Sequence, residues 1–183
     1  SAYGGAAYLA SKGRIYYVGG VKSSTASESN FLKRSASYDP VANTWDPETP
    51  TMNDGTAYNT VLADETSGLV IAFSGNYWDS NFVSEIIYPF NQAIDTSSNT
   101  WGYVADSPSP LGRAYTCGAV LDGKMWLVGG SQFNGTIVKQ IDVYDPLNYT
   151  WEDLNPFFPA YYSYNPAVYA VNGKIYIVSG AWS

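Results

Sequence analysis

The chain has 183 residues, of which 45% are hydrophobic, 16% aromatic and 14% charged, and its formal net charge at pH 7 is −7. This size and apolar content support a folded domain rather than a disordered tail. The acidic balance argues against a phosphate-binding groove of clustered Lys and Arg, so nucleic acid is not an expected partner, and no apolar run is long enough to span a membrane.

An apolar segment that ends in glycine recurs four times along the chain. The copies are residues 15–20, 70–75, 125–130 and 175–180, so their last glycines are separated by 55, 55 and 50 residues. Each copy is apolar almost without interruption, which predicts a strand buried on both faces. The closing glycine allows the backbone to bend where a side chain would clash.

A second marker follows the same period and contains a tryptophan. Residues 38–45 read Tyr-Asp-Pro-Val-Ala-Asn-Thr-Trp, residues 144–151 repeat this pattern, and residues 94–101 keep it in a degenerate form without the Tyr-Asp-Pro opening. The recurring Asp39, Asp95 and Asp145 are predicted to shape turns, because Asp can accept hydrogen bonds from the backbone that follows it. The recurring Trp45, Trp101 and Trp151 are expected to pack in the core or between blades.

The segments between these markers complete a four-stranded unit. In the third copy, residues 117–121 and 125–128 flank Asp122-Gly123, and Asp-Gly between apolar runs is a strong hairpin signal. A third strand then ends in Tyr-Asp-Pro, and a fourth strand contains the tryptophan. The sequence therefore predicts an all-β fold of antiparallel four-stranded sheets.

These residues resemble the kelch repeat family, in which a hydrophobic strand ending in Gly-Gly is followed by a spaced Tyr and then by a Trp. The resemblance implies a β-propeller with four strands in each blade and covers residues 1–183 as a single segment. Blades are expected at about residues 3–52, 53–106 and 107–158, with a partial blade at 159–183. The second and fourth copies depart from the family in having Ser-Gly, and residues 112–116 lack the histidine of its Arg-x-x-His pattern.

About three and a half blades are too few to close a propeller, because an open array leaves apolar faces and strand edges in water. Two interpretations remain open. Either the chain is a fragment of a longer protein that carries further blades, or another subunit supplies them.

Candidate binding residues lie in the loops that follow the second strands and in those between blades, which share one face in the kelch family. Aromatic and amide groups suited to sugars or peptides are concentrated in Tyr77, Trp78, Asp79 and Asn81, and again in Tyr161 and Tyr162. The alternative interpretation is that these aromatic side chains pack on their own blades.

Arg113 and Tyr115 are further binding candidates. Arg113 begins an inner strand and could point into the central channel, or it could pair with a carboxylate of the blade such as Asp106. The chain has no histidine, so no metal site or cofactor is expected. Galactose oxidase is a copper enzyme on a similar propeller, and its site uses histidines and a cysteine-linked tyrosine. Cys117, two residues after Tyr115, is the only possible counterpart of that cysteine here. The expectation for Cys117 is a buried apolar role.

The sequence thus favours a non-catalytic scaffold that binds a protein or glycan partner, or further blades, through its loops. The alternative is a fragment of a secreted propeller enzyme, an oxidase or a sugar-modifying enzyme, whose catalytic groups lie elsewhere. Asn134 and Asn148 stand in N-glycosylation sequons, which together with the acidity favours an extracellular location over a cytoplasmic one.

Overall fold

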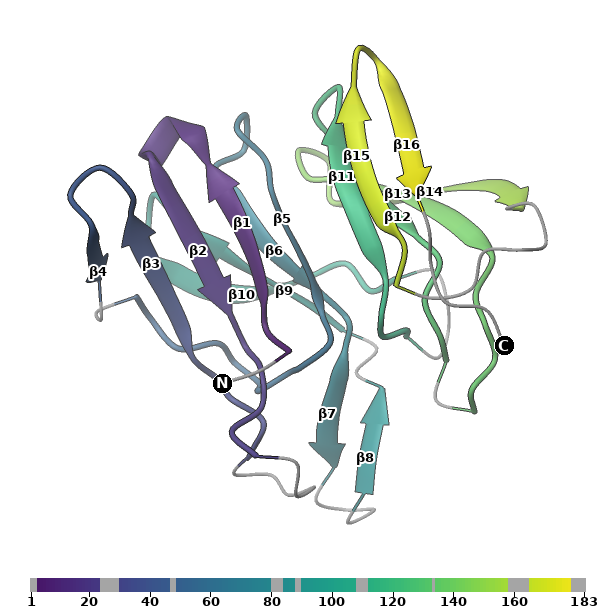
Figure 1. The fold of residues 1–183 in the computed structure, drawn as a ribbon, viewed down its shortest axis with the longest axis horizontal. Helices are drawn as coiled ribbons and strands as arrows, with labels where there is room; N and C mark the ends of the chain where they lie inside the picture. Colours follow the sequence, from purple (N-terminus) through teal and green to yellow (C-terminus); the bar gives the residue numbers. More distant parts are fainter. Residues whose placement is uncertain are drawn as a thin grey trace.

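The structure, a computed structural model, consists of antiparallel β-sheets arranged as successive blades (Figure 1). It describes residues 3–23, 30–46, 49–79, 84–87, 90–107, 112–132, 134–157 and 165–178. No helix within these ranges is long and apolar enough to cross a membrane.

Three blades have four strands each, and a fourth sheet has two. Blade 1 contains β1 (Gly5–Leu9), β2 (Arg14–Val18), β3 (Ser35–Asp39) and β4 (Thr44–Asp46), with a short 3-10 helix, η1 (Ala10–Lys12), between β1 and β2. Blade 2 contains β5 (Thr60–Ala63), β6 (Leu69–Phe73), β9 (Asn91–Asp95) and β10 (Thr100–Val104). Blade 3 contains β11 (Cys117–Leu121), β12 (Lys124–Val128), β13 (Gln140–Asp145) and β14 (Thr150–Phe157), and the two-stranded sheet contains β15 (Ala167–Val171) and β16 (Lys174–Val178).

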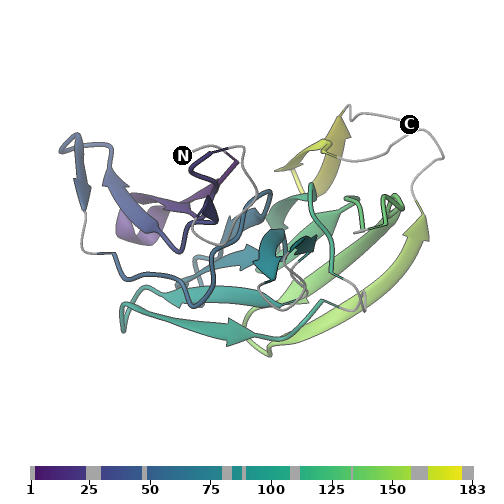
Figure 2. The same ribbon diagram turned by 90° about the horizontal axis from the view of Figure 1, so that it is seen from below.

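This order confirms the all-β fold of about three and a half four-stranded blades. One element was not expected: β7 (Asn76–Asp79) and β8 (Ser84–Ile87) form a separate hairpin where the sequence indicated a loop. Figure 1 shows this hairpin extending from one end of blade 2, and Figure 2 views the blades from that end.

The first strands of successive blades lie next to one another. β1 contacts β5, β5 contacts β11, and β11 contacts β15. The remaining strands of each sheet lie progressively further from this row, as expected for blades around a common axis. The row of first strands is therefore the inner side of the array.

Strand β6 shows how the blades bury both faces. Val70 and Ala72 pack with residues of blade 1, whereas Leu69, Ile71 and Phe73 pack with residues of blade 3. All five side chains are buried. Because neighbouring side chains of a strand point to opposite faces, an uninterrupted apolar strand supplies two blade interfaces at once.

The tryptophans of the fourth strands join neighbouring blades. The Trp101 indole N–H donates to the carbonyl of Pro50 at 2.9 Å, and the Trp151 indole N–H donates to the carbonyl of Ala105 at 3.1 Å. Each acceptor belongs to the segment that leaves the preceding blade. The repeat therefore uses its tryptophan as a hydrogen-bonded link between blades as well as an apolar group.

Trp45 departs from the expectation of a tryptophan packed in the core or between blades, because its exposed fraction is 57%. No described blade precedes blade 1, so no described segment lies where Pro50 and Ala105 lie for the other two tryptophans. A cavity of about 400 Å³ on this face is lined by Tyr17, Arg34, Ala36 and Trp45. Trp45 is exposed because blade 1 lies at the edge of the described array.

The aspartates that recur before each third turn have the predicted role. Asp39 accepts hydrogen bonds from the backbone N–H groups of Val41 and Ala42, both at 2.9 Å. Asp95 and Asp145 accept corresponding bonds from the residues two and three positions further on. These contacts confirm the interpretation of the three aspartates as turn residues.

Candidate functional site

Three tyrosines form a row of rings in contact at the inner side of the blades, and we call this row the tyrosine ladder. Tyr3, Tyr58 and Tyr115 each lie two residues before the first strand of a blade. The ring centroids of Tyr3 and Tyr58 are 4.5 Å apart, and those of Tyr58 and Tyr115 are 4.7 Å apart. Tyr3 is 60% exposed, so the outermost ring of the ladder presents an aromatic surface to solvent.

Backbone hydrogen bonds hold the ladder residues in place. The Tyr58 N–H donates to the Tyr3 carbonyl at 2.8 Å, the Tyr115 N–H donates to the Tyr58 carbonyl at 3.1 Å, and the Asn165 N–H donates to the Tyr115 carbonyl at 2.9 Å. All four residues have φ between 56° and 62°, in the left-handed region. A non-glycine residue persists there only when its surroundings hold it, and these bonds do so from blade to blade.

A pocket lies beside Tyr115, and we call it the hairpin pocket. Its volume is about 320 Å³, and it lies between the β7–β8 hairpin of blade 2 and the loop that follows β12 in blade 3. The lining residues are Asn76, Ile86, Ile87, Tyr115, Ser131, Gln132 and Gly135. The described lining thus combines an aromatic ring and two isoleucines with amides and a hydroxyl, and it carries no formal charge.

The structure places the first group of predicted binding residues in strand β7. Tyr77 is half-buried and pairs in register with Ile86. Trp78 and Asp79 belong to the same strand, although their side chains fall outside the described part of the structure. Asn81, Tyr161 and Tyr162 lie outside the described residues altogether.

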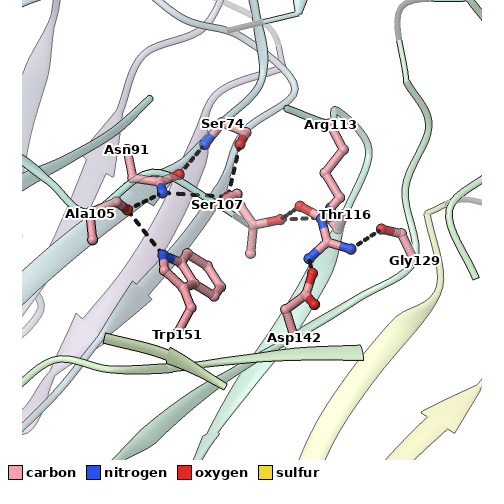
Figure 3. A network of polar contacts seen from close by, with 10 residues as sticks. Ser74, Asn91, Ala105, Ser107, Arg113, Thr116, Gly129, Asp142 and Trp151 are labelled. Atoms are coloured by element: carbon pink, nitrogen blue, oxygen red, sulfur yellow. Dashed lines mark hydrogen bonds and ion pairs between the residues drawn. The ribbon is translucent and has the colours of Figure 1, made fainter. Parts of the chain in front are cut away.

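Arg113 does not face the channel. Its side chain is 1% exposed, it forms an ion pair with the equally buried Asp142, and its Nη1 donates to the carbonyl of Gly129 at 3.3 Å (Figure 3). Arg113 thus forms a salt bridge to a carboxylate of the blades, which was the second of the two expectations from sequence. The carboxylate is that of Asp142 and not that of Asp106. Burial lowers the pKa of the Arg113 guanidinium, and the charge of Asp142 opposes that shift.

Cys117 lies at the start of β11 and packs against the cluster that joins blade 3 to β15 and β16. It is half-buried, and burial raises the pKa of its thiol. Its Sγ lies 3.8 Å from Oδ1 of Asn165. Among the described residues, no cluster of three or more Cys, Asp and Glu side chains could hold a metal ion.

The two sequons have different surroundings. Asn134 is exposed on the loop after β12, where its Oδ1 accepts a hydrogen bond from the Thr136 N–H at 3.0 Å. Asn148 lies in the turn between β13 and β14, and its amide Nδ2 donates to Asp145 at 2.8 Å. Within the described part of the chain, a carboxylate therefore engages the side-chain nitrogen of Asn148 but not that of Asn134.

Sequence reasoning selected Tyr115 but missed Tyr3 and Tyr58. A signal was present, because an Ala-Tyr pair precedes the first strand of three blades, at residues 2–3, 57–58 and 114–115. The fourth copy has Tyr164-Asn165 in its place. The period of this pair matches that of the glycine and tryptophan markers.

The blades, the row of inner strands and the ladder across it define a β-propeller repeat protein. A family model described as the Kelch motif matches residues 112–157, which contain all four strands of blade 3. The chain is 31% identical over 120 residues to Kelch-like protein 25 of Xenopus tropicalis, an alignment that covers 63% of this chain and 19% of that protein. These matches, together with the fold, support a kelch-repeat propeller family for this chain.

A solved structure titled "Structure of YjhT" shares the fold. It superimposes on this chain with a TM-score of 0.72 and 16% sequence identity, covering 94% of this chain and 57% of that one. The chain therefore spans about a fifth of the curated relative and somewhat more than half of the YjhT chain. At this level of identity the YjhT structure supports the fold alone.

Proposed function

We propose that this chain is the binding segment of a kelch propeller and that it binds a protein partner at the end that carries the tyrosine ladder and the hairpin pocket. Kelch repeats and the similarity to a Kelch-like protein support a protein-interaction scaffold in general. The choice of surface depends on one observation, which is that Tyr115 belongs both to the ladder and to the wall of the pocket.

The ladder suits a binding role for an energetic reason. Association costs the ordering of side chains at the interface, and a group that is already fixed in the free protein avoids that cost. The backbone bonds and ring contacts of the ladder fix Tyr58 and Tyr115 before any partner arrives. Tyrosine also offers a large apolar ring and a polar hydroxyl, a combination that is enriched at binding hot spots.

The proposal includes assembly with further blades. Trp45 and the cavity beside it are open on one side of the array, and Tyr169, Val171, Tyr176 and Val178 are between 48% and 60% exposed on β15 and β16 at the other. Apolar surface of this kind favours burial against another blade. The hairpin pocket lies between blades 2 and 3, so a partner bound there and further blades at the two open sides would not compete.

The test is a selection of linear peptides from a displayed random library against this chain, followed by affinity measurements on variants. Tyr58→Asn and Tyr115→Asn remove a ring but keep a residue that the repeat itself uses in the left-handed conformation at Asn165. The control is Tyr149→Asn, because Tyr149 has the same φ of 57° and is 54% exposed in the turn between β13 and β14.

The expected result is that the selected peptides lose at least about tenfold in affinity on Tyr115→Asn and keep their affinity on Tyr149→Asn, as a hot-spot aromatic residue requires. Two outcomes would argue against a protein partner at this end. The selected peptides could bind the exposed face around Trp45 instead, or glycans could bind at the ladder where no peptide does.

The proposed location is extracellular. Asn134 is the better acceptor of the two sequons in the folded chain, because it is exposed and no carboxylate among the described residues holds its nitrogen. Mass spectrometry of material from a native source tests the location, and unmodified Asn134 and Asn148 would contradict it.

A further inference from the structure

The pairing of strand β7 determines which backbone groups of β8 face outward. Asn76 uses both its N–H and its carbonyl to bond Ala57, at 2.8 Å and 2.9 Å. In the β7–β8 ladder, Asn76 lies opposite Ile87. Because the backbone groups of Asn76 point toward Ala57, Asn76 and Ile87 are a pair that exchanges no hydrogen bonds.

The rest of β8 follows from that pair, because hydrogen-bonded and non-bonded pairs alternate along an antiparallel ladder. Tyr77 and Ile86 are then a bonded pair, and Trp78 and Glu85 are again a non-bonded pair. Consequently, Glu85 and Ile87 direct their N–H and carbonyl groups away from β7. Among the described residues, β8 pairs with β7 and with no other strand.

This outward edge borders the hairpin pocket. Ile86 and Ile87 both line the pocket, with Tyr115, Ser131 and Gln132 among the residues on its other sides. The volume of about 320 Å³ is at the small end of the ~300–1,000 Å³ that ligand pockets usually occupy. A pocket of that size beside a strand edge suits one or two side chains of a longer ligand.

We infer that β8 binds an extended peptide segment of the partner as an additional β-strand, with an uncharged side chain of that segment inserted into the hairpin pocket. This inference rests on the proposed function and specifies its ligand. Outward N–H and carbonyl groups two residues apart match the backbone of a peptide strand, and side-chain pockets beside such an edge give specificity. The described lining of the pocket is uncharged, which disfavours a charged side chain there, because burial of an unpaired charge is costly.

The test compares two variants at one position with the peptides selected on the unaltered chain. Glu85→Pro removes an outward N–H and leaves the bonded pair of Tyr77 and Ile86 intact, and proline is tolerated on a strand edge in that orientation. Glu85→Ala removes the same side chain but keeps the N–H, so it is the matched control. We expect Glu85→Pro to bind about tenfold more weakly than Glu85→Ala, whose affinity stays close to that of the unaltered chain.

Hydrogen exchange on the unaltered chain gives a second readout that does not depend on how the proline variant folds. Bound peptide should protect the backbone amides of Glu85 and Ile87 from exchange. In addition, N-methylation of the peptide at every second residue should weaken its binding, because only alternate N–H groups of an added strand point toward β8. Equal affinities for the two Glu85 variants, or no added protection at these amides, overturn strand addition. If such a peptide still depends on Tyr115, the proposed function survives; if no selected peptide depends on Tyr115, the proposed function fails as well.

Discussion

The indole N–H of Trp151 in blade 3 lies 3.1 Å from the carbonyl of Ala105, the residue that follows the last strand of blade 2. The same carbonyl accepts a hydrogen bond from the Asn91 side-chain amide at 2.8 Å. Asn91 is fully buried and also accepts from the Ser74 backbone N–H at 3.0 Å (Figure 3). One carbonyl thus joins the interior of blade 2 to the outer part of blade 3.

Replacement of this tryptophan should destabilise the fold more than replacement of its counterpart in blade 1. Trp151→Phe loses the bond to Ala105 and leaves a partly buried carbonyl with one donor fewer, at a cost of about 1–2 kcal/mol in the free energy of unfolding. Trp45→Phe should cost less than about 0.5 kcal/mol, because Trp45 is 57% exposed. Urea unfolding of both variants measures the difference, and equal losses would contradict the link between blades.

The buried ion pair of Arg113 and Asp142 should make a single replacement more destabilising than a double one. Arg113→Met leaves the carboxylate of Asp142 buried without its cation, and the free energy of unfolding should fall by about 3–5 kcal/mol. The double variant Arg113→Met with Asp142→Leu removes both charges and should recover most of that loss. A double-mutant cycle by urea unfolding checks this, and a double variant as unstable as the single one would show that the pair is not coupled.

Replacement of Tyr144, unlike the replacements above, should not lower the stability of the fold. Its hydroxyl is buried and has no hydrogen-bond partner within the described residues, while its ring packs 5.0 Å from Trp151 and 5.7 Å from Phe73. Burial raises the pKa of Tyr144 to about 12. Tyr144→Phe keeps the packing and removes the unpaired hydroxyl, so stability should be unchanged or rise by up to about 1 kcal/mol. A clear loss of stability in thermal unfolding would reveal a hydrogen bond to that hydroxyl.

The free energy of unfolding should fall in acid as the turn aspartates become protonated. Hydrogen bonds from the Ala42 backbone, the Ser97 backbone and the Asn148 side chain lower the pKa values of Asp39, Asp95 and Asp145, respectively. Their pKa values are lower in the folded than in the unfolded chain. Their contribution is therefore fully present above the unfolded value of about 3.9 and is lost as the pH falls below it.

A triple variant with Asn at these three aspartates isolates that effect, because Asn keeps an oxygen acceptor and does not titrate in this range. Its thermal midpoint should depend less on pH between about 4 and 2 than that of the unaltered chain. Parallel pH profiles for the two proteins would show that other carboxylates cause the acid sensitivity.

The repeat and its strands could be predicted from sequence because their markers reflect local requirements. The three markers are a glycine at a bend, an Asp in a turn and an uninterrupted apolar strand between two blades. Each depends on neighbouring residues that recur with the same period. The β7–β8 hairpin escaped prediction because Asn76 to Asp79 carry polar residues typical of a loop. Trp45 was misjudged because its exposure depends on whether a blade precedes blade 1, which its own sequence does not encode.

The candidate site was harder to predict because its contacts join residues from different blades. Arg113 and Asp142 are 29 positions apart, and no local pattern favours their pairing over a pairing of Arg113 with Asp106. The ladder depends on a left-handed backbone at Tyr3, Tyr58 and Tyr115, a conformation that tyrosine does not favour by itself. The recurring Ala-Tyr pair would have located these positions, but not the contacts between their rings.

The ladder positions are joined to one another through main-chain atoms, from Tyr3 through Tyr58 and Tyr115 to Asn165. Peptide groups are the same whatever residue carries them, and the fourth position already holds an asparagine in the same conformation. The side chains at these positions can therefore be exchanged for others that tolerate the left-handed conformation, while the joints between the inner strands remain in place. A designer could use these four positions to alter ligand preference on an otherwise unchanged framework.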